Sequence, residues 1–86
     1  MSATPKRSRR VASPKTAFGF VLRQLREQEG YSQDSFAHRT GYHRNYVGQL
    51  ERGEKSPSLG ALFNLSKALN LRPSQLLERV EIRLGY

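Results

Sequence analysis

The long hydrogen-bonding side chains of this sequence gather in one segment, GYHRNYVGQLERG, which spans residues 41–53. Arg44 and Asn45 are followed by Gln49 after four to five residues, so a helix would place all three on one face. An arginine can bond the edge of a guanine through two N–H groups, and asparagine or glutamine can bond adenine in a similar way. The segment therefore indicates recognition of base edges. The alternative is a solvated polar face, which on its own would be the better interpretation of Gln49.

Catalytic and metal chemistry find little support in the sequence. It contains no cysteine, which excludes disulfides, thiolate nucleophiles and cysteine-ligated zinc. The two histidines are His38 and His43, and Asp34 lies one turn before His38, but a triad would still need a nucleophile and an enclosed pocket. Two histidines without a third ligand are a weak metal site. We therefore expect no enzyme activity, no metal and no cofactor.

The net charge gives an independent indication of the partner. Fifteen Lys and Arg against seven Asp and Glu give a net charge of +8 and a pI near 10.6, which is typical of nucleic-acid binding. The charge is uneven, because residues 1–15 hold five basic residues and no acid. Residues 16–86 hold ten basic and seven acidic residues, a net of only +3. Composition alone therefore also fits a nearly neutral domain with a basic tail.

The length of 86 residues allows one small domain, and no separate domain for a small-molecule effector fits beside it. No apolar run approaches the roughly 18 residues that would span a bilayer. No hydrophobic segment follows the basic N-terminus, so a secretory signal is not predicted and we expect a cytoplasmic protein. Without disulfides, stability must come from a well-packed helical core or from a dimer partner.

Apolar spacing predicts the elements that position the polar segment. Residues 1–15 contain two prolines and three serines and are predicted to form a disordered basic tail. A first helix is predicted from about residue 16 to residue 29, ending before Gly30. Its apolar face is formed, at helical spacing, by Phe18, Val21, Leu22 and Leu25.

Two short helices are predicted next to each other in the middle of the chain. Ser32 is a suitable N-cap for a helix over residues 33–40, and Gly41 provides the turn that ends it. The next helix is predicted from about residue 44 to residue 52, stopped by Gly53. The pair fits a helix-turn-helix, because each fixed position of that motif carries a suitable residue type. These positions are Phe36, Ala37, Gly41, Val47 and Leu50.

Two more helices complete the predicted all-α domain. Ser58 is expected to cap a fourth helix, whose core side would be formed by Leu59, Leu62, Leu65, Ala68 and Leu69. Pro73 opens a fifth helix, with inward residues Leu76, Leu77 and Val80. Residues 80–86 alternate like a strand but also fit helical spacing, and we favour an extension of the fifth helix. The predicted organisation is a tail over 1–15, a domain over 16–79 and an extension over 80–86.

The sequence resembles the Cro/cI-type helix-turn-helix family, the lambda-repressor-like domains often called XRE-type. The similarity is carried by Ser32 and Gln33, Tyr46 and Val47, Glu51 to Gly53, Pro57 to Leu59, and Lys67 to Leu69. It covers about residues 18–79 and implies a compact five-helix fold and a sequence-specific regulator of transcription that binds double-stranded DNA. The sequence also departs from the family pattern. Ser35 replaces the usual acid of the capping box, so its helix is predicted to lose one cap bond. His43 stands where a Ser or Thr usually caps the next helix, and we do not expect it to act as a cap. Gly60 weakens its helix by about 1 kcal/mol.

The resemblance assigns roles to individual residues. In such proteins the second helix of the motif lies in the major groove with its N-terminal residues at base edges. The base-reading candidates are Arg44, Asn45 and Gln49, with His43 as a fourth. The phosphate-binding candidates are Gln33, Arg39, Tyr46, Arg52, Lys55 and Ser56, of which Arg39 is equally well interpreted as an exposed charge. The resemblance also implies a buried ion pair between Arg26 and Glu51, whose loss of one partner would cost roughly 3–5 kcal/mol.

We expect a homodimer on a palindromic operator with half-sites about one helical turn apart. The expected dimer contact consists of Leu77, Val80, Ile82, Leu84 and Tyr86. The basic tail is either an arm that reaches the DNA or a source of long-range attraction, and we favour the second. An antitoxin or another protein-interaction module with the same fold is the main alternative. RNA is disfavoured, because its deep, narrow major groove excludes a helix.

Overall fold

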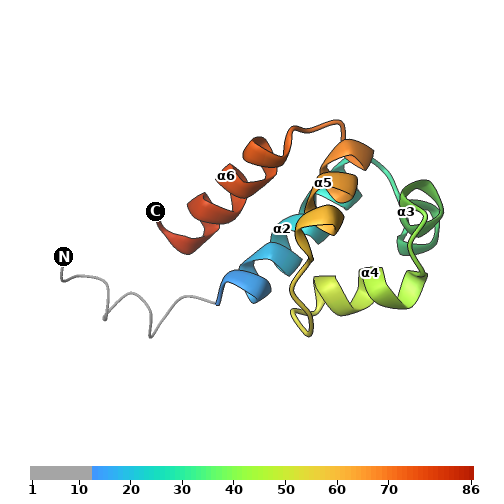
Figure 1. The fold of residues 1–86 in the computed structure, drawn as a ribbon, viewed down its shortest axis with the longest axis horizontal. Coiled ribbons are helices and arrows are strands. Elements are labelled where there is room, and N and C mark those ends of the chain that lie inside the picture. The colour runs from blue at the N-terminus through green and yellow to red at the C-terminus, as the bar shows by residue number, and fades with distance from the viewer. Residues whose placement is uncertain (1–12) are drawn as a thin grey trace.

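The computed structural model describes residues 13–86, which form five helices and contain no strand (Figure 1). In chain order these are α2 (Pro14–Gln28), α3 (Gln33–Thr40), α4 (Arg44–Glu51), α5 (Leu59–Ala68) and α6 (Pro73–Leu84). The expected all-α class with five helices is therefore confirmed. Within residues 13–86, no helix has the length and apolar character needed to cross a bilayer.

Helix α2 begins earlier than predicted. The Ser13 side chain accepts a hydrogen bond from the Thr16 backbone N–H at 3.3 Å, and Pro14 occupies the first helical position, where its fixed φ suits a helix. The predicted disordered tail over residues 1–15 is therefore wrong for Pro14 and Lys15, which are helical. The remainder of that prediction, residues 1–12, lies outside the described residues.

The caps of α3 and α4 correct two predictions. The Ser35 hydroxyl accepts the Ser32 N–H at 2.9 Å while Ser32 Oγ accepts the Ser35 N–H at 3.0 Å, so the capping box is complete without an acid. The predicted loss of one cap bond is wrong, because the short serine side chain reaches the same donor. His43 is the N-cap of α4, and its Nδ1 accepts the Asn45 N–H at 3.1 Å.

The five helices are joined by a closed ring of contacts. Helix α2 contacts α4 and α6, α3 contacts α4 and α5, and α5 contacts α6. Figure 1 shows α3 and α4 together at one end of the molecule and α6 toward the other end. The largest fully buried side chains, contributed by every helix, are Phe36, Leu22, Leu50, Leu65, Leu76 and Val47. The helix-turn-helix thus rests on the same core as the rest of the domain.

Helix α6 continues through residue 84, so the favoured helical reading of the C-terminal segment is confirmed. No break separates residues 79 and 80, and the helix ends at Gly85 with φ of 89°. Leu77 was expected to face inward but is 44% exposed, because Leu76 and Val80 fill the inward face and Leu77 is rotated by about 100° from Leu76. Leu59 was also expected in the core, yet it is the first residue of α5 and is 71% exposed.

Gly19 marks the closest approach between α2 and α4. A Cβ atom at this position would lie 2.3 Å from the Leu50 carbonyl oxygen and 2.7 Å from that of Glu51. Both contacts are with backbone atoms, which cannot move aside as the end of a flexible side chain can. Glycine is therefore required at position 19 for the last turn of α4 to pack against α2.

We expect Gly19→Ala to lower the free energy of unfolding by about 1–3 kcal/mol, because the added methyl group must push the two helices apart. Gly60→Ala is the matched control, since nothing lies within 4 Å of its Cβ position. Alanine is the better helix former, so the control should gain up to about 1 kcal/mol. Urea denaturation followed by circular dichroism measures both changes. Equal stability of the two variants would contradict the close approach at Gly19.

Candidate nucleic-acid interface

A buried ion pair fixes α4 relative to α2. Arg26 Nε donates to Glu51 Oε2 at 2.6 Å, Arg26 Nη2 donates to Glu51 Oε1 at 3.0 Å, and Arg26 Nη1 donates to the Tyr31 carbonyl oxygen at 2.7 Å. The two side chains are only 8% and 3% exposed. The hydrogen bonds to Glu51 hold the pKa of Arg26 above its ordinary value, so the guanidinium stays charged. The ion pair implied by the resemblance is present, and it joins the last turn of α2 to the end of α4.

Gln33 extends this network to the start of α3. Its Nε2 donates to Glu51 Oε1 at 3.0 Å, so one carboxylate binds residues from both α2 and α3. An amide nitrogen carries two hydrogens, and Glu51 uses one of them. Gln33 was a candidate for phosphate binding, and its second amide N–H remains for such a contact.

The first turn of α4 presents polar side chains to solvent. Arg44 and Asn45 are exposed, whereas Val47 and Leu50 on the opposite side are fully buried. Gln49, one turn further on, is half-buried. The exposed residues at the N-terminus are therefore held in place by apolar anchors on the opposite face of the same helix.

His43 precedes this turn and is itself exposed. Because Nδ1 accepts the Asn45 N–H, a neutral ring carries its proton on Nε2. The ring therefore offers an N–H donor beside Arg44 and Asn45. Within residues 13–86, no group of three His, Cys, Asp or Glu side chains is arranged to hold a metal ion.

Tyr46 is half-buried and packs edge-on against Tyr42, with ring centroids 5.1 Å apart. The Tyr42 hydroxyl in turn accepts a hydrogen bond from Asn64 Nδ2 at 2.9 Å. These contacts attach the turn between α3 and α4 to α5. The apolar part of Tyr46 therefore contributes to packing, and its position beside the exposed turn keeps it a candidate for a phosphate contact.

Arg44 has a partner on the neighbouring helix. Its Nε lies 3.2 Å from Asp34 Oδ1, and the two side chains are 60% and 74% exposed. Asp34 occupies the first turn of α3, where the helix dipole favours an acid. The sequence interpretation considered His38 as the neighbour of Asp34 and missed this cross-helix pair. The sequence indicated this pair only through the opposite charges of Asp34 and Arg44, which stand in the first turns of two adjacent helices.

The loop after α4 carries the other exposed candidates. Arg52 Nε donates to Glu54 Oε2 at 2.7 Å, and this bond holds the pKa of Glu54 below its ordinary value. Both groups are open to solvent, and exposed pairs of this kind add little to stability, so Arg52 can exchange Glu54 for a phosphate at small cost. Lys55 and Ser56 follow and are exposed.

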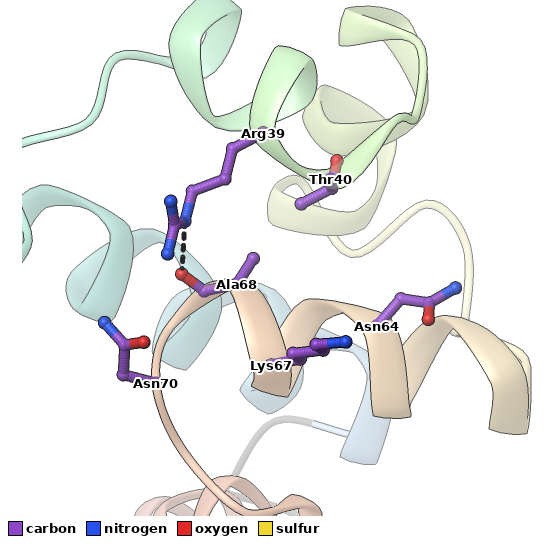
Figure 2. Close-up of a pocket in the computed structure, with 6 residues that line it drawn as sticks. All are labelled: Arg39, Thr40, Asn64, Lys67, Ala68 and Asn70. Atoms are coloured by element: carbon purple, nitrogen blue, oxygen red, sulfur yellow. Dashed lines mark hydrogen bonds between the residues drawn. The ribbon is translucent and has the colours of Figure 1, made fainter.

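Arg39 is exposed, as one of its two interpretations expected, and its guanidinium also has a partner within the chain. Figure 2 shows its guanidinium reaching from α3 to the end of α5, where Nε donates to the Ala68 carbonyl oxygen at 2.8 Å. The same group lies 5.4 Å from the centre of the Tyr31 ring. Carbonyls at a helix end lack partners within the helix, so Arg39 satisfies one of them. It borders a hollow of about 410 Å³ that Lys67 and Asn70 also line, and phosphate binding by Arg39 stays a prediction.

The expected dimer contact is partly wrong. Val80 and Leu84 are 6% and 9% exposed because they pack into the chain's own core, so they offer almost no surface to a second copy. The other three candidates, Leu77, Ile82 and Tyr86, are exposed.

The sequence interpretation missed Leu59 and Phe63, which are 71% and 55% exposed. The sequence indicated a shared apolar surface through their spacing of four residues, which places both side chains on one face of α5. Leu59 borders an apolar groove of about 340 Å³ between the start of α2, the loop before α5 and α6. We call this the α2–α6 groove; residues that line it include Phe18, Pro57, Leu59, Leu62, Leu77 and Val80.

Known proteins are similar to this chain in sequence and in fold. The profile of a family described as "Helix-turn-helix" matches residues 22–76. Control protein C.BamHI of Bacillus amyloliquefaciens is 37% identical over 62 residues, which are 71% of this chain and 76% of that protein. Control protein C.SmaI of Serratia marcescens is 40% identical over 58 residues, 67% of this chain and 69% of that protein. The crystal structure of the restriction-modification controller protein C.AhdI from Aeromonas hydrophila matches with a TM-score of 0.68 at 41% identity, covering 71% of this chain and 92% of that one.

Proposed function

This chain belongs to the helix-turn-helix family of Cro/cI type, and from that membership we propose that it reads the sequence of double-stranded DNA through the first turn of α4. The chain is a DNA-binding transcriptional regulator of this family. The observation that carries the proposal is the exposure of Arg44 and Asn45 on a short helix that is anchored from its other side. We propose that the protein acts by binding rather than by catalysis, in the cytoplasm.

The chemistry of the first turn suits the major groove. Arg44 can donate two hydrogen bonds to guanine, and the Asn45 amide can both donate to and accept from adenine. His43 adds a donor through Nε2, while Gln49 is half-buried and reaches the groove one turn later. Each good bidentate contact discriminates between bases by about 1–3 kcal/mol. Arg44 and Asn45 are therefore the principal readers, with His43 and Gln49 as secondary ones.

Phosphate contacts on both sides would fix the register of α4 in the groove. On one side, the second amide N–H of Gln33 lies at the N-terminus of α3, where backbone N–H groups also favour an anion. On the other side, Arg52, Lys55 and Ser56 follow the end of α4. Because Gln33 is bonded to Glu51 at the end of α4, a phosphate bound there is placed at a set distance from the base-reading turn.

Selection of bound sequences from random duplex DNA at fixed salt tests the proposal, with wild type, Arg44→Ala and Arg79→Ala in parallel. Arg79 is exposed on α6, a helix that Figure 1 shows apart from α4, so its loss removes the same charge without touching the proposed reading helix. We expect wild type and Arg79→Ala to enrich the same site. Arg44→Ala should lose information at one base pair of each half-site, because the bidentate contact is gone.

A different outcome of this selection would contradict base reading by α4. If no protein enriches a site and binding falls steeply with salt, the charge supplies only non-specific attachment. The proposal that α4 recognises base edges would then be wrong. A protein partner, as for an antitoxin, would become the better proposal.

We also propose that two copies bind a palindromic operator, with half-sites about one helical turn apart. The exposed apolar side chains Leu59, Phe63 and Leu77 support this proposal, because two of them border the α2–α6 groove. A contact there would bury apolar surface that a small domain without disulfides otherwise leaves in water. Deleting the chain after Arg79 would not test this surface, since it also removes Val80 and Leu84 from the core.

Leu77→Glu should convert the dimer into a monomer, because it places a charge in an apolar contact without a partner. Gln75→Glu is the matched control: it adds the same charge to α6, and its carboxylate can still accept the Arg72 N–H as the amide does at 2.8 Å. Sedimentation equilibrium measures the mass of each variant. A dimer that persists in Leu77→Glu, or a monomeric wild type at concentrations that saturate DNA, would refute this interface.

A further inference from the structure

Asp34 is an acid on the surface that the proposed function turns toward DNA. Its carboxylate lies 3.2 Å from Arg44 Nε, across the junction of α3 and α4. Other acids near this surface belong to separate pairs, Glu51 with Arg26 and Glu54 with Arg52. A carboxylate repels phosphates, so an acid here weakens the general attraction to DNA. Its place beside the principal base reader calls for a physical explanation.

We propose that Asp34 is a positioning residue, which holds the Arg44 guanidinium ready for guanine and lowers binding to DNA that lacks it. The inference rests on the proposed function, namely base reading by Arg44. The geometry supports it because the carboxylate approaches the guanidinium from the side of Nε, at 3.2 Å. The two terminal nitrogens, Nη1 and Nη2, remain as the fork that matches the guanine acceptors N7 and O6.

Orientation matters because Arg44 is a long side chain with 60% of its surface exposed. A free arginine samples many rotamers, and ordering it on binding reduces affinity for the correct base. A contact to Nε restricts the torsions nearest the guanidinium before DNA arrives. Part of the conformational entropy of Arg44 is then already lost in the free protein, so ordering the side chain on binding costs the guanine contact less free energy.

The charge of Asp34 adds discrimination of a second kind. When Arg44 meets guanine, its charge and hydrogen bonds are fully used and Asp34 remains paired with it. When Arg44 meets a base without suitable acceptors, the carboxylate still faces the phosphates of the same DNA. Asp34 therefore lowers affinity for wrong sequences more than for the right one, and specificity depends on that difference.

Asp34 also stands in the first turn of α3, where an acid stabilises the helix through its dipole, and His38 lies one turn later on the same helix. A purely structural role makes a different prediction. Loss of α3 stability would weaken the whole interface, so specific and non-specific binding would fall together. Positioning instead requires affinity for non-specific DNA to rise relative to affinity for the specific site, so that discrimination is lost.

The test compares wild type, Asp34→Asn and Asp34→Glu, each alone and with Arg44→Ala. Dissociation constants are measured at fixed salt for the selected operator, for the operator with the Arg44-dependent base pair replaced, and for an unrelated duplex. Thermal unfolding is recorded for each variant. We expect Asp34→Asn to reduce discrimination at that base pair by about two- to fivefold, the range for an exposed ion pair, while affinity for the unrelated duplex rises. Asp34→Glu should retain discrimination, because the longer carboxylate still reaches Nε.

Combined with Arg44→Ala, Asp34→Asn should leave base preference unchanged, since Asp34 acts through Arg44. Discrimination that is intact in the folded Asp34→Asn variant overturns this inference and leaves base reading by Arg44 standing. Specific and non-specific affinity that fall together also overturn it, in favour of the structural role. If Arg44→Ala itself changes no base preference, the proposed reading by α4 fails, and the positioning role fails with it.

Discussion

The position of α4 depends on the buried pair between Arg26 and Glu51. Two charges with less than a tenth of their side chains exposed must be paired, because a buried charge without a partner costs several kcal/mol. The pair can form only when the end of α4 meets the last turn of α2, and Gly19 permits that approach. Gln33 bonds the same carboxylate and brings the start of α3 to the same point. Three helices are thereby aligned by one carboxylate.

This arrangement explains how an eight-residue helix can present a rigid surface. Helices of that length are unstable alone in water, so α4 depends on tertiary contacts and on its cap. The contacts come from Val47 and Leu50, and the cap from His43. Arg44 and Asn45 at the N-terminus of α4 take no part in this core packing, so their exposed side chains are available to a partner. The division between a buried face and an exposed face follows from the spacing of apolar residues along the segment.

Local patterns in the sequence predicted most of the fold. The bounds of α3, the glycine stops and the inward residues of the helix-turn-helix follow from helical spacing and from the need for positive φ at Gly41 and Gly53. What the sequence could not reveal depends on distance in space. Gly19 matters only because the backbone of α4 crosses it, and Arg39 bonds a carbonyl 29 residues further along the chain.

The same distinction applies to the candidate interface. Exposure of Arg44 and Asn45 was predictable from the pattern, whereas the pairing of Arg44 with Asp34 required the packing of α3 against α4. The cap by His43 was missed for another reason. Histidine is not among the preferred cap residues, and only its ring orientation shows that Nδ1 accepts a hydrogen bond. Leu77 shows what apolar spacing alone cannot predict. Leu76 and Leu77 both fit an apolar stripe on the helix, but adjacent residues cannot both face the core, and Leu77 is the exposed one.

The most direct test of the account is methylation protection by dimethyl sulfate on a duplex that the protein selects. This reagent modifies guanine N7 in the major groove and adenine N3 in the minor groove, so it reports which groove the protein occupies. The account predicts protection of a guanine N7 in each half-site, and renewed reactivity at the same guanine when Arg44→Ala is bound instead. Protection of adenine N3 without any protected guanine N7 would contradict the placement of α4 in the major groove.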